Sequence, residues 1–297
     1  MKKNEIYKIW KDLWIDDNKI EKIILKITDL SKSQLFLCDD IDEIFINDIK
    51  NSFIRINNCE PIEYIINKAE FYWLDFYVDN RVLIPRNDTE IMVESVLKEI
   101  ENNKNNITII DVWTGSSCIA VSVLMNLSPP PAGTPLKYKG RVIENSYVID
   151  ISKEALEVSK INIKLYNLEN QINQIKWDLL KEILNNNKYN IEKSIIITAN
   201  LPYIKNGDFE NMDNETIKFE PDIALYWWEN TWFEMYERLI NQCIELKKQY
   251  NLENIVLFIE IWFDQKEVCE NFLNNLWISY ELFKDNSGIE RCVKIRI

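Results

Sequence analysis

The strongest constraint on the fold is an alternation between short apolar runs rich in β-branched residues and longer amphipathic stretches. The runs are typical of buried strands, and they lie at residues 107–111, 146–150, 194–199 and 254–261, with a further short strand expected at 172–176. Apolar residues at helical spacing between and after them predict helices over residues 117–126, 155–165, 231–249 and 264–275. Strands that alternate with helices predict a parallel sheet with helices on both faces.

The ends of the chain depart from this alternation. Residues 279–283 and 291–297 form two final apolar runs with no helical stretch between them, which predicts an antiparallel hairpin. The expected fold is therefore α/β, with a doubly wound, seven-stranded, mostly parallel sheet that ends in this hairpin. At the other end, Ile20, Ile23 and Ile24 recur at helical spacing, which predicts a small helical domain over residues 1–69.

A short segment joins the two parts. Residues 70–78 and 81–84 flank an Asp-Asn turn, which predicts a hairpin or an extended linker over residues 70–86, so that the main domain spans residues 87–297. Asn87 and Glu90 have the spacing of a capping pair at the start of the next helix. The helical domain is either a packing appendage or a surface that docks the substrate.

Composition excludes several classes of function. A net charge of −13 and a pI near 4.7 argue against a protein that binds long nucleic acids through their phosphates. The six cysteines include no C-x-x-C pair, and no signal peptide or long apolar run is present, so we expect reduced thiols, a cytoplasmic location and no membrane contact. The absence of histidine removes His-based triads, bases and metal ligands, and we expect no metal.

Two strand ends carry the residues of a candidate site. Asp111 ends one strand, and the small residues that follow it form a tight turn before a helix, which is how α/β folds bind nucleotide-like cofactors. Asn200 follows the strand at 194–199 and presents one amide acceptor and two donors. With Pro202 stiffening the turn and Tyr203 supplying a flat ring, this end could hold a planar –NH₂ group. An ordinary strand exit is the alternative.

Together, the segments at the ends of these two strands resemble the motifs of the class I S-adenosylmethionine-dependent methyltransferases. The first motif of that family is D-x-G-x-G-x-G, and the fourth is N-P-P-Y or N-L-P-Y. Here these motifs read D-V-W-T-G-S-S at residues 111–117 and N-L-P-Y at residues 200–203. A narrower resemblance lies in I-P-R-N-D-T-E at residues 84–90, preceded by A-E-F-Y-W-L-D-F-Y-V at residues 69–78. These segments, with matches at 60–65, 219–221 and 287–291, resemble the peptide chain release factor glutamine methyltransferases.

This resemblance implies an enzyme that transfers a methyl group from S-adenosylmethionine to the glutamine amide in the Gly-Gly-Gln motif of release factors. The catalytic residues that it implies are Asn200, Leu201, Pro202 and Tyr203. The cofactor-binding residues are Asp111, Trp113, Thr114, Gly115, Ser116, Ser117, Asp150, Asp178, Leu179 and Asn200. The substrate-binding residues are Arg86, Glu90, Glu220 and the Asn200–Tyr203 segment. We expect a monomer that binds no nucleic acid directly.

Two alternatives remain. N-L-P-Y is also typical of ribosomal RNA adenine dimethyltransferases, so a nucleic-acid adenine methyltransferase is the first. The second is a non-catalytic relative whose cofactor loop is blocked by Trp113.

The tryptophans themselves are unusual, because the chain has 10 Trp and 5 Gly, whereas glycine is ordinarily about 7% of residues. Aligned with the family, Trp stands at expected glycine positions 14, 73, 113, 177, 227, 228, 232, 262 and 277. We hypothesise that one codon, UGA, was translated as Trp where the source organism reads Gly. A Pro-rich stretch at residues 128–140 is expected to be a surface insertion.

Overall fold

The computed structural model describes residues 1–11, 15–103, 105–127, 143, 145–202, 218–225 and 233–297. The chain divides into two compact units, which are described separately. The first comprises Met1–Lys68 with Asn211–Glu220, and the second comprises Ala69–Glu210 with Pro221–Ile297. The insertion expected at 128–140 lies outside the described residues.

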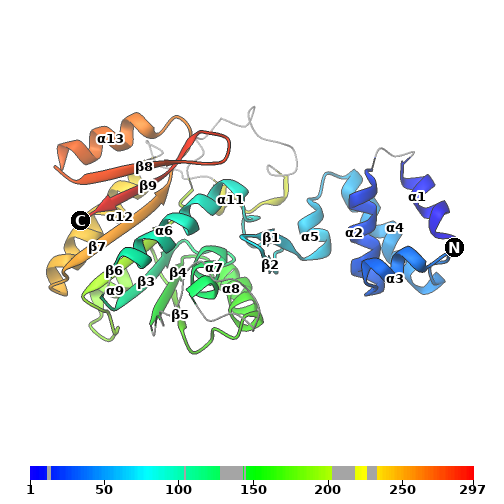
Figure 1. The fold of residues 1–297 in the computed structure, drawn as a ribbon, viewed down its shortest axis with the longest axis horizontal. Helices are drawn as coiled ribbons and strands as arrows, with labels where there is room; N and C mark the ends of the chain where they lie inside the picture. The colour runs from blue at the N-terminus through cyan, green and yellow to red at the C-terminus, as the bar shows by residue number, and fades with distance from the viewer. Residues whose placement is uncertain (12–14, 104, 128–142, 144, 203–217, 226–232) are drawn as a thin grey trace. The chain divides into compact units, whose positions relative to one another are not determined.

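The second unit is built on a seven-stranded sheet in the order β5-β4-β3-β6-β7-β9-β8 (Figure 1). In that order the strands are β5 (Ile172–Lys176), β4 (Ser146–Asp150), β3 (Ile107–Val112), β6 (Ser194–Ala199), β7 (Asn254–Glu260), β9 (Glu290–Arg296) and β8 (Ser279–Lys284). The first five are parallel, and β9 is antiparallel to both β7 and β8. The predicted fold class is therefore confirmed.

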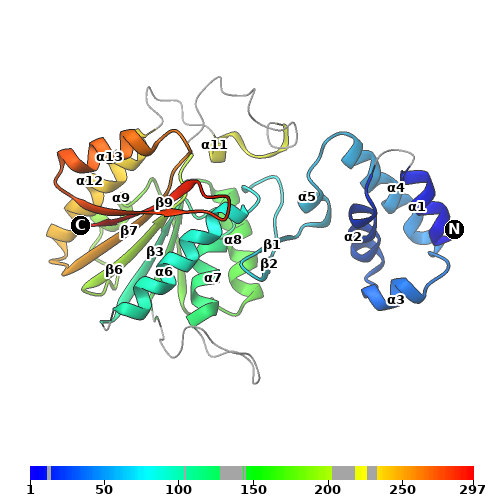
Figure 2. The ribbon, with the colours of Figure 1, turned by 45° about the horizontal axis from the view of Figure 1, so that its top comes forward.

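Helices cover both faces of this sheet (Figure 2). On one face lie α6 (Glu90–Asn102), α7 (Cys118–Leu127) and α8 (Lys153–Leu165). On the other lie α9 (Lys181–Asn185), α12 (Glu234–Gln249) and α13 (Lys266–Asn275). The short helix α11 (Asp222–Leu225) completes the unit.

Alternate strand residues pack against the two helical layers. Ile195 and Ile197 join the cluster under α12, whereas Ile196 between them joins the cluster under α6 and α7. Every residue of β3, β4 and β6 is buried. Because each buried Ile or Val stabilises the fold by roughly 1.5–3 kcal/mol, strands that are apolar on both sides favour a sheet enclosed by two layers.

The order of strands creates a crevice at one end of the sheet. The chain proceeds from β3 outward to β4 and β5, then returns to the other side of β3 to form β6 and β7. The helix after β3 lies on one face of the sheet, and α12, which precedes β7, lies on the other. Connections that leave β3 and β6 in opposite directions open a crevice at their carboxyl ends, where open α/β sheets bind ligands.

A short hairpin precedes α6, but its turn lies at residues 72–73 and not at Asp79-Asn80, where the sequence predicted it. β1 (Ala69–Phe71) and β2 (Leu74–Phe76) pair antiparallel. The predicted capping role of Asn87 is wrong. Asn87 begins a 3₁₀ turn, η1 (Asn87–Thr89), and the N-cap residue of α6 is Thr89, whose side chain makes no cap bond. Glu90 Oε1 instead accepts the backbone N–H of Tyr72 at 2.8 Å, which ties the hairpin to the start of α6.

The first unit is helical, as the spacing of its isoleucines predicts. Its helices are α1 (Lys3–Lys11), α2 (Asp17–Thr28), α3 (Lys32–Leu37), α4 (Glu43–Asn57) and α5 (Ile62–Ile66). Their apolar faces form one cluster, in which the rings of Trp10 and Phe53 stack with centroids 4.0 Å apart. The predicted division of the chain into three domains stays a prediction.

Candidate active site

A pocket opens at the crevice between the ends of β3 and β6. Among its lining residues are Arg86, Thr89, Trp113, Gly115, Asp150 and Asn200. The sequence places these residues in four separate segments, and the fold gathers them. The segment 81–86 and helix α11 also line the pocket, although residues 81–85 and 223–224 were assigned no site role from the sequence.

Hydrogen bonds hold the loop after β3 in a tight turn. Thr114 Oγ1 donates to Asp111 Oδ2 at 2.5 Å, and the Thr114 N–H donates to the Ile149 carbonyl at 3.0 Å. The Gly115 N–H donates to Asp150 Oδ2 at 2.9 Å. The loop is therefore fixed against the neighbouring strand β4. Gly115 has a φ of +54° and no heavy atom within 4 Å of where a Cβ would lie, so its backbone faces open space.

Asp111 supports this loop from behind. Its two carboxylate oxygens accept the hydroxyls of Thr114 and of Thr198 on β6, the latter at 2.6 Å. The side chain is 1% exposed, and burial raises its pKa to about 6. Because Asp111 does not line the described pocket, its predicted position near the cofactor amino group stays a prediction.

Asp150 ends β4 and does line the pocket. Its carboxylate accepts the N–H groups of Gly115 and Ser152, both at 2.9 Å. Burial raises its pKa to about 6. Each carboxylate oxygen has a second lone pair, so Asp150 keeps the capacity to accept hydroxyl groups of a ligand.

Asn200 projects from the end of β6 and is oriented by a residue that the sequence did not single out. Its amide Nδ2 donates to the hydroxyl of Thr89 at 3.4 Å, and Thr89 is 3% exposed. An amide whose nitrogen is engaged in this way leaves its oxygen as the acceptor for a ligand. Thr89 belongs to the I-P-R-N-D-T-E segment, in which the sequence predicts site roles only for Arg86 and Glu90.

The residues after Asn200 are partly described. Leu201 and Pro202 are buried, and the Leu201 N–H donates to the hydroxyl of Tyr236 at 3.2 Å. Tyr203, for which we predicted a stacking role, lies outside the described residues.

Other predicted residues are not gathered into this pocket among the residues that the structure describes. Asp178 pairs with Lys181 at 2.5 Å and with Arg238 at 2.6 Å, and Leu179 is fully buried. Glu220 is counted with the first unit. Ser117 lies behind the loop, where its hydroxyl meets that of Ser159 at 2.6 Å. The roles predicted for these residues stay predictions.

The backbone bears on the unusual tryptophans. Trp73, Trp113 and Trp277 have φ values of 66°, 63° and 57°, in the left-handed region that glycine adopts freely and bulky residues rarely adopt. Trp177 and Trp262 are not in that region, and positions 14, 227, 228 and 232 lie outside the described residues. The three left-handed tryptophans support the hypothesis that the natural protein has glycine at these positions.

The sheet order, the loop after β3 and the asparagine after β6 are those of a class I methyltransferase. Comparison with solved structures agrees on the fold. The catalytic domain of human METTL16 in complex with a MAT2A 3′ UTR hairpin superposes with a TM-score of 0.53, covering 95% of this chain and 91% of that chain. At 14% identity this likeness shows the fold alone.

Curated relatives identify the family. The release factor glutamine methyltransferase of Clostridium acetobutylicum is 35% identical in an alignment of 269 positions that covers 89% of this chain and 86% of the relative. That of Clostridium botulinum is 30% identical in an alignment of 299 positions, gaps included, that covers 98% of this chain and 96% of the relative. The chain therefore belongs to the release factor glutamine methyltransferase family. No protein-family model matches it.

These comparisons confirm the predicted family and enzyme class, and with them S-adenosylmethionine as the cofactor. They do not favour the alternative of a nucleic-acid adenine methyltransferase. Within the described residues, no helix has the length and apolar character needed to cross a membrane.

Proposed function

We propose that this enzyme methylates the side-chain amide nitrogen of the glutamine in the Gly-Gly-Gln motif of peptide chain release factors. Family membership supports this substrate. The observation that carries the proposal is the placement of Asn200 at the crevice with its amide nitrogen directed to Thr89. That placement leaves an acceptor for one N–H of a substrate amide.

The pocket residues fit S-adenosylmethionine in their chemistry. Asp150 would accept from the ribose hydroxyls, and the open backbone at Gly115 would let the ligand approach closely. The space is restricted, because the hollow measures about 60 Å³, whereas ligand pockets usually measure about 300–1,000 Å³. The indole of Trp113 is among the lining groups, and a glycine there would remove it.

The chemistry asks mainly for positioning. When bound, S-adenosylmethionine supplies a methyl group that is already activated by the sulfonium charge. A glutamine amide nitrogen is a weak nucleophile, so its orientation matters most. Asn200 Oδ1 would accept one amide N–H and the Leu201 carbonyl the other, which aims the nitrogen and disperses the positive charge that develops on it. As the methyl–sulfur bond breaks and the methyl–nitrogen bond forms, the nitrogen becomes strongly acidic and one of its protons passes to water. No strong base is therefore required, which agrees with a chain that has no histidine.

The other predicted roles complete this proposal. Arg86 lines the pocket and would shape the site for the glutamine, together with Glu90, Glu220 and Tyr203. The helical first unit would dock the release factor. We further infer that the enzyme acts as a monomer in the cytoplasm during translation termination, without binding nucleic acid or membranes.

The test is transfer of a labelled methyl group from S-adenosylmethionine to a purified release factor. We expect labelling of the wild-type factor and none of a factor whose Gly-Gly-Gln glutamine is replaced by alanine. Equal labelling of the two factors, or labelling of RNA instead, would contradict the proposal.

Thr89→Val should lower kcat by about tenfold, because loss of the hydroxyl frees the Asn200 amide to rotate and misplaces its oxygen. The KM for S-adenosylmethionine should hardly change. Thr89→Ser keeps the hydroxyl and should retain most of the activity. Steady-state kinetics of both variants check this, and equal activity of the valine and serine variants would show that the bond has no role.

Cofactor affinity should depend on the ionisation of Asp150. Its pKa is raised to about 6, and the carboxylate is the form that accepts ribose hydroxyls. Affinity should therefore be constant above about pH 7 and should fall about tenfold per pH unit below about pH 6. Calorimetric titrations from pH 5 to 8 test this.

Asp150→Asn is the control for that series. Its affinity should be lower at neutral pH and flat across the range. A slope that persists in the variant would point to Asp111, whose pKa is also raised to about 6, and would remove the ribose role from Asp150.

A further inference from the structure

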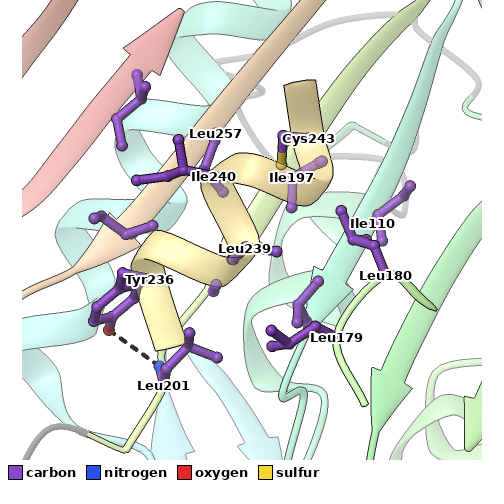
Figure 3. Packing of buried hydrophobic residues seen from close by; sticks show 14 of the residues in the cluster. Ile110, Leu179, Leu180, Ile197, Leu201, Tyr236, Leu239, Ile240, Cys243 and Leu257 are labelled. Carbon is purple, nitrogen blue, oxygen red and sulfur yellow. Dashed lines mark hydrogen bonds between the residues drawn. The ribbon is translucent and has the colours of Figure 1, made fainter. Parts of the chain in front are cut away.

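Tyr236 connects the core of the second unit to the end of β6. It lies in the first turn of α12 and is fully buried. Its ring packs against Phe233, with centroids 5.4 Å apart. In sequence it belongs to an ordinary apolar stripe, so nothing there distinguishes it from a core residue. Figure 3 shows its hydroxyl pointing at the Leu201 backbone among the packed aliphatic side chains.

The hydroxyl joins two strand ends at the point where their pairing stops. The last register pair between β6 and β7 is Ala199 with Ile259. Immediately beyond it, the Tyr236 hydroxyl accepts the Leu201 N–H at 3.2 Å and donates to the Glu260 carbonyl. One side chain thereby fixes the backbone of both strands at the crevice.

This bond constrains the residues that would hold the substrate amide. The Leu201 N–H belongs to the peptide plane that follows Asn200, so fixing that plane restricts the direction in which Asn200 leaves the strand. On the other side of Leu201, the ring of Pro202 restricts Leu201 to extended conformations. Leu201 is therefore held from both sides, and the direction of its carbonyl follows.

We propose that the Tyr236 hydroxyl is a positioning group for methyl transfer, acting through the Asn200–Leu201 backbone. The inference rests on the proposed function, in which Asn200 Oδ1 and the Leu201 carbonyl accept the two hydrogens of the glutamine amide. Tyr236 touches neither substrate nor cofactor in this account. It keeps the two acceptors at the spacing and angle that a planar amide requires.

Tyr236→Phe tests the proposal because it removes the hydroxyl and keeps the ring. We expect kcat to fall by about tenfold to a hundredfold, since small misplacements of reacting groups cost rates of this order. The KM values for S-adenosylmethionine and the release factor should stay nearly unchanged. The Leu201 amide, followed by NMR with ¹⁵N-leucine, should exchange with solvent faster than in the wild type.

Tyr147 supplies a matched control within the same hydrophobic cluster. It is 5% exposed, and its hydroxyl also bridges backbone groups, donating to the Asn190 carbonyl and accepting the Asn190 N–H, each at 3.1 Å. It does not line the described pocket. Tyr147→Phe should lower the unfolding temperature about as much as Tyr236→Phe does, and it should leave kcat unchanged.

Unchanged kcat in Tyr236→Phe, or an equal loss of kcat in Tyr147→Phe, would overturn the proposal. A wild-type enzyme that methylates no release factor would instead contradict the proposed function. In that case the exchange of the Leu201 amide decides: unchanged exchange in Tyr236→Phe overturns the inference, and faster exchange in that variant alone supports the positioning bond.

Discussion

Asn200→Ala should lower kcat for release factor methylation by about a hundredfold to a thousandfold, the loss found when one preorganised polar group at a reacting centre is removed. Alanine keeps the backbone and takes away the acceptor for one substrate N–H. The affinity for S-adenosylmethionine should be nearly unchanged, because Asp150 and the Gly115 loop remain. Single-turnover kinetics and calorimetry measure the two quantities separately.

Asn162→Ala is the control for this variant. Asn162 is a buried asparagine, whereas Asn200 is half-buried. The Asn162 amide nitrogen donates to the carbonyls of Tyr77 and Ser116, at 2.9 and 3.0 Å, and the residue does not line the described pocket. Its loss should reduce stability more than kcat. Transfer that persists at the wild-type rate in Asn200→Ala would remove the role assigned to Asn200.

Trp113→Gly should increase the affinity for S-adenosylmethionine by at least about tenfold, equivalent to about 1.4 kcal/mol. The indole leaves a hollow that is now about 60 Å³, which gives the cofactor room. The same change removes the strain of a bulky residue in the left-handed region at φ 63°, of order 1–3 kcal/mol, and this second effect raises stability rather than affinity. Calorimetric titration of both proteins measures the change.

Two other tryptophans separate these effects. Trp73 and Trp277 also have positive φ, but they are 87% and 94% exposed and do not line the described pocket. Replacing either with glycine should raise the unfolding temperature without changing cofactor affinity. If all three variants bind the cofactor as the parent does, Trp113 does not restrict the site. The mass of the peptide spanning 107–127 from the native source shows directly whether residue 113 is glycine.

Much of the fold could be predicted because its strands are defined locally. The runs at 146–150 and 194–199 have the bounds of β4 and β6, and the short strand expected at 172–176 has the bounds of β5. β4 and β6 are buried along their whole length, and burial on both faces makes such runs continuous and therefore easy to recognise. The start of α6 was harder to predict, because Glu90 accepts the Tyr72 backbone N–H rather than serving as a capping partner. A hydrogen bond across the linker leaves no pattern at helical spacing in the sequence.

The site was predictable to a smaller extent. The strand ends themselves were visible, because Asp111 and Asp150 lie at the ends of recognisable strands and Asn200 follows one. The groups that orient them were not. Thr89 is 111 residues from Asn200, and Tyr236 is 35 residues from Leu201. Such contacts depend on packing between helices and strand ends, so a buried threonine or tyrosine in an apolar stripe looks like any core residue.

The most direct measurement is made on the release factor isolated from source cells with and without this gene. The peptide that carries Gly-Gly-Gln should be heavier by one methyl group when the gene is present, and fragmentation should place that group on the glutamine side chain. In cells without the gene the methyl group should be absent. An unmodified glutamine in both strains, or a methyl group that persists without the gene, would contradict the account.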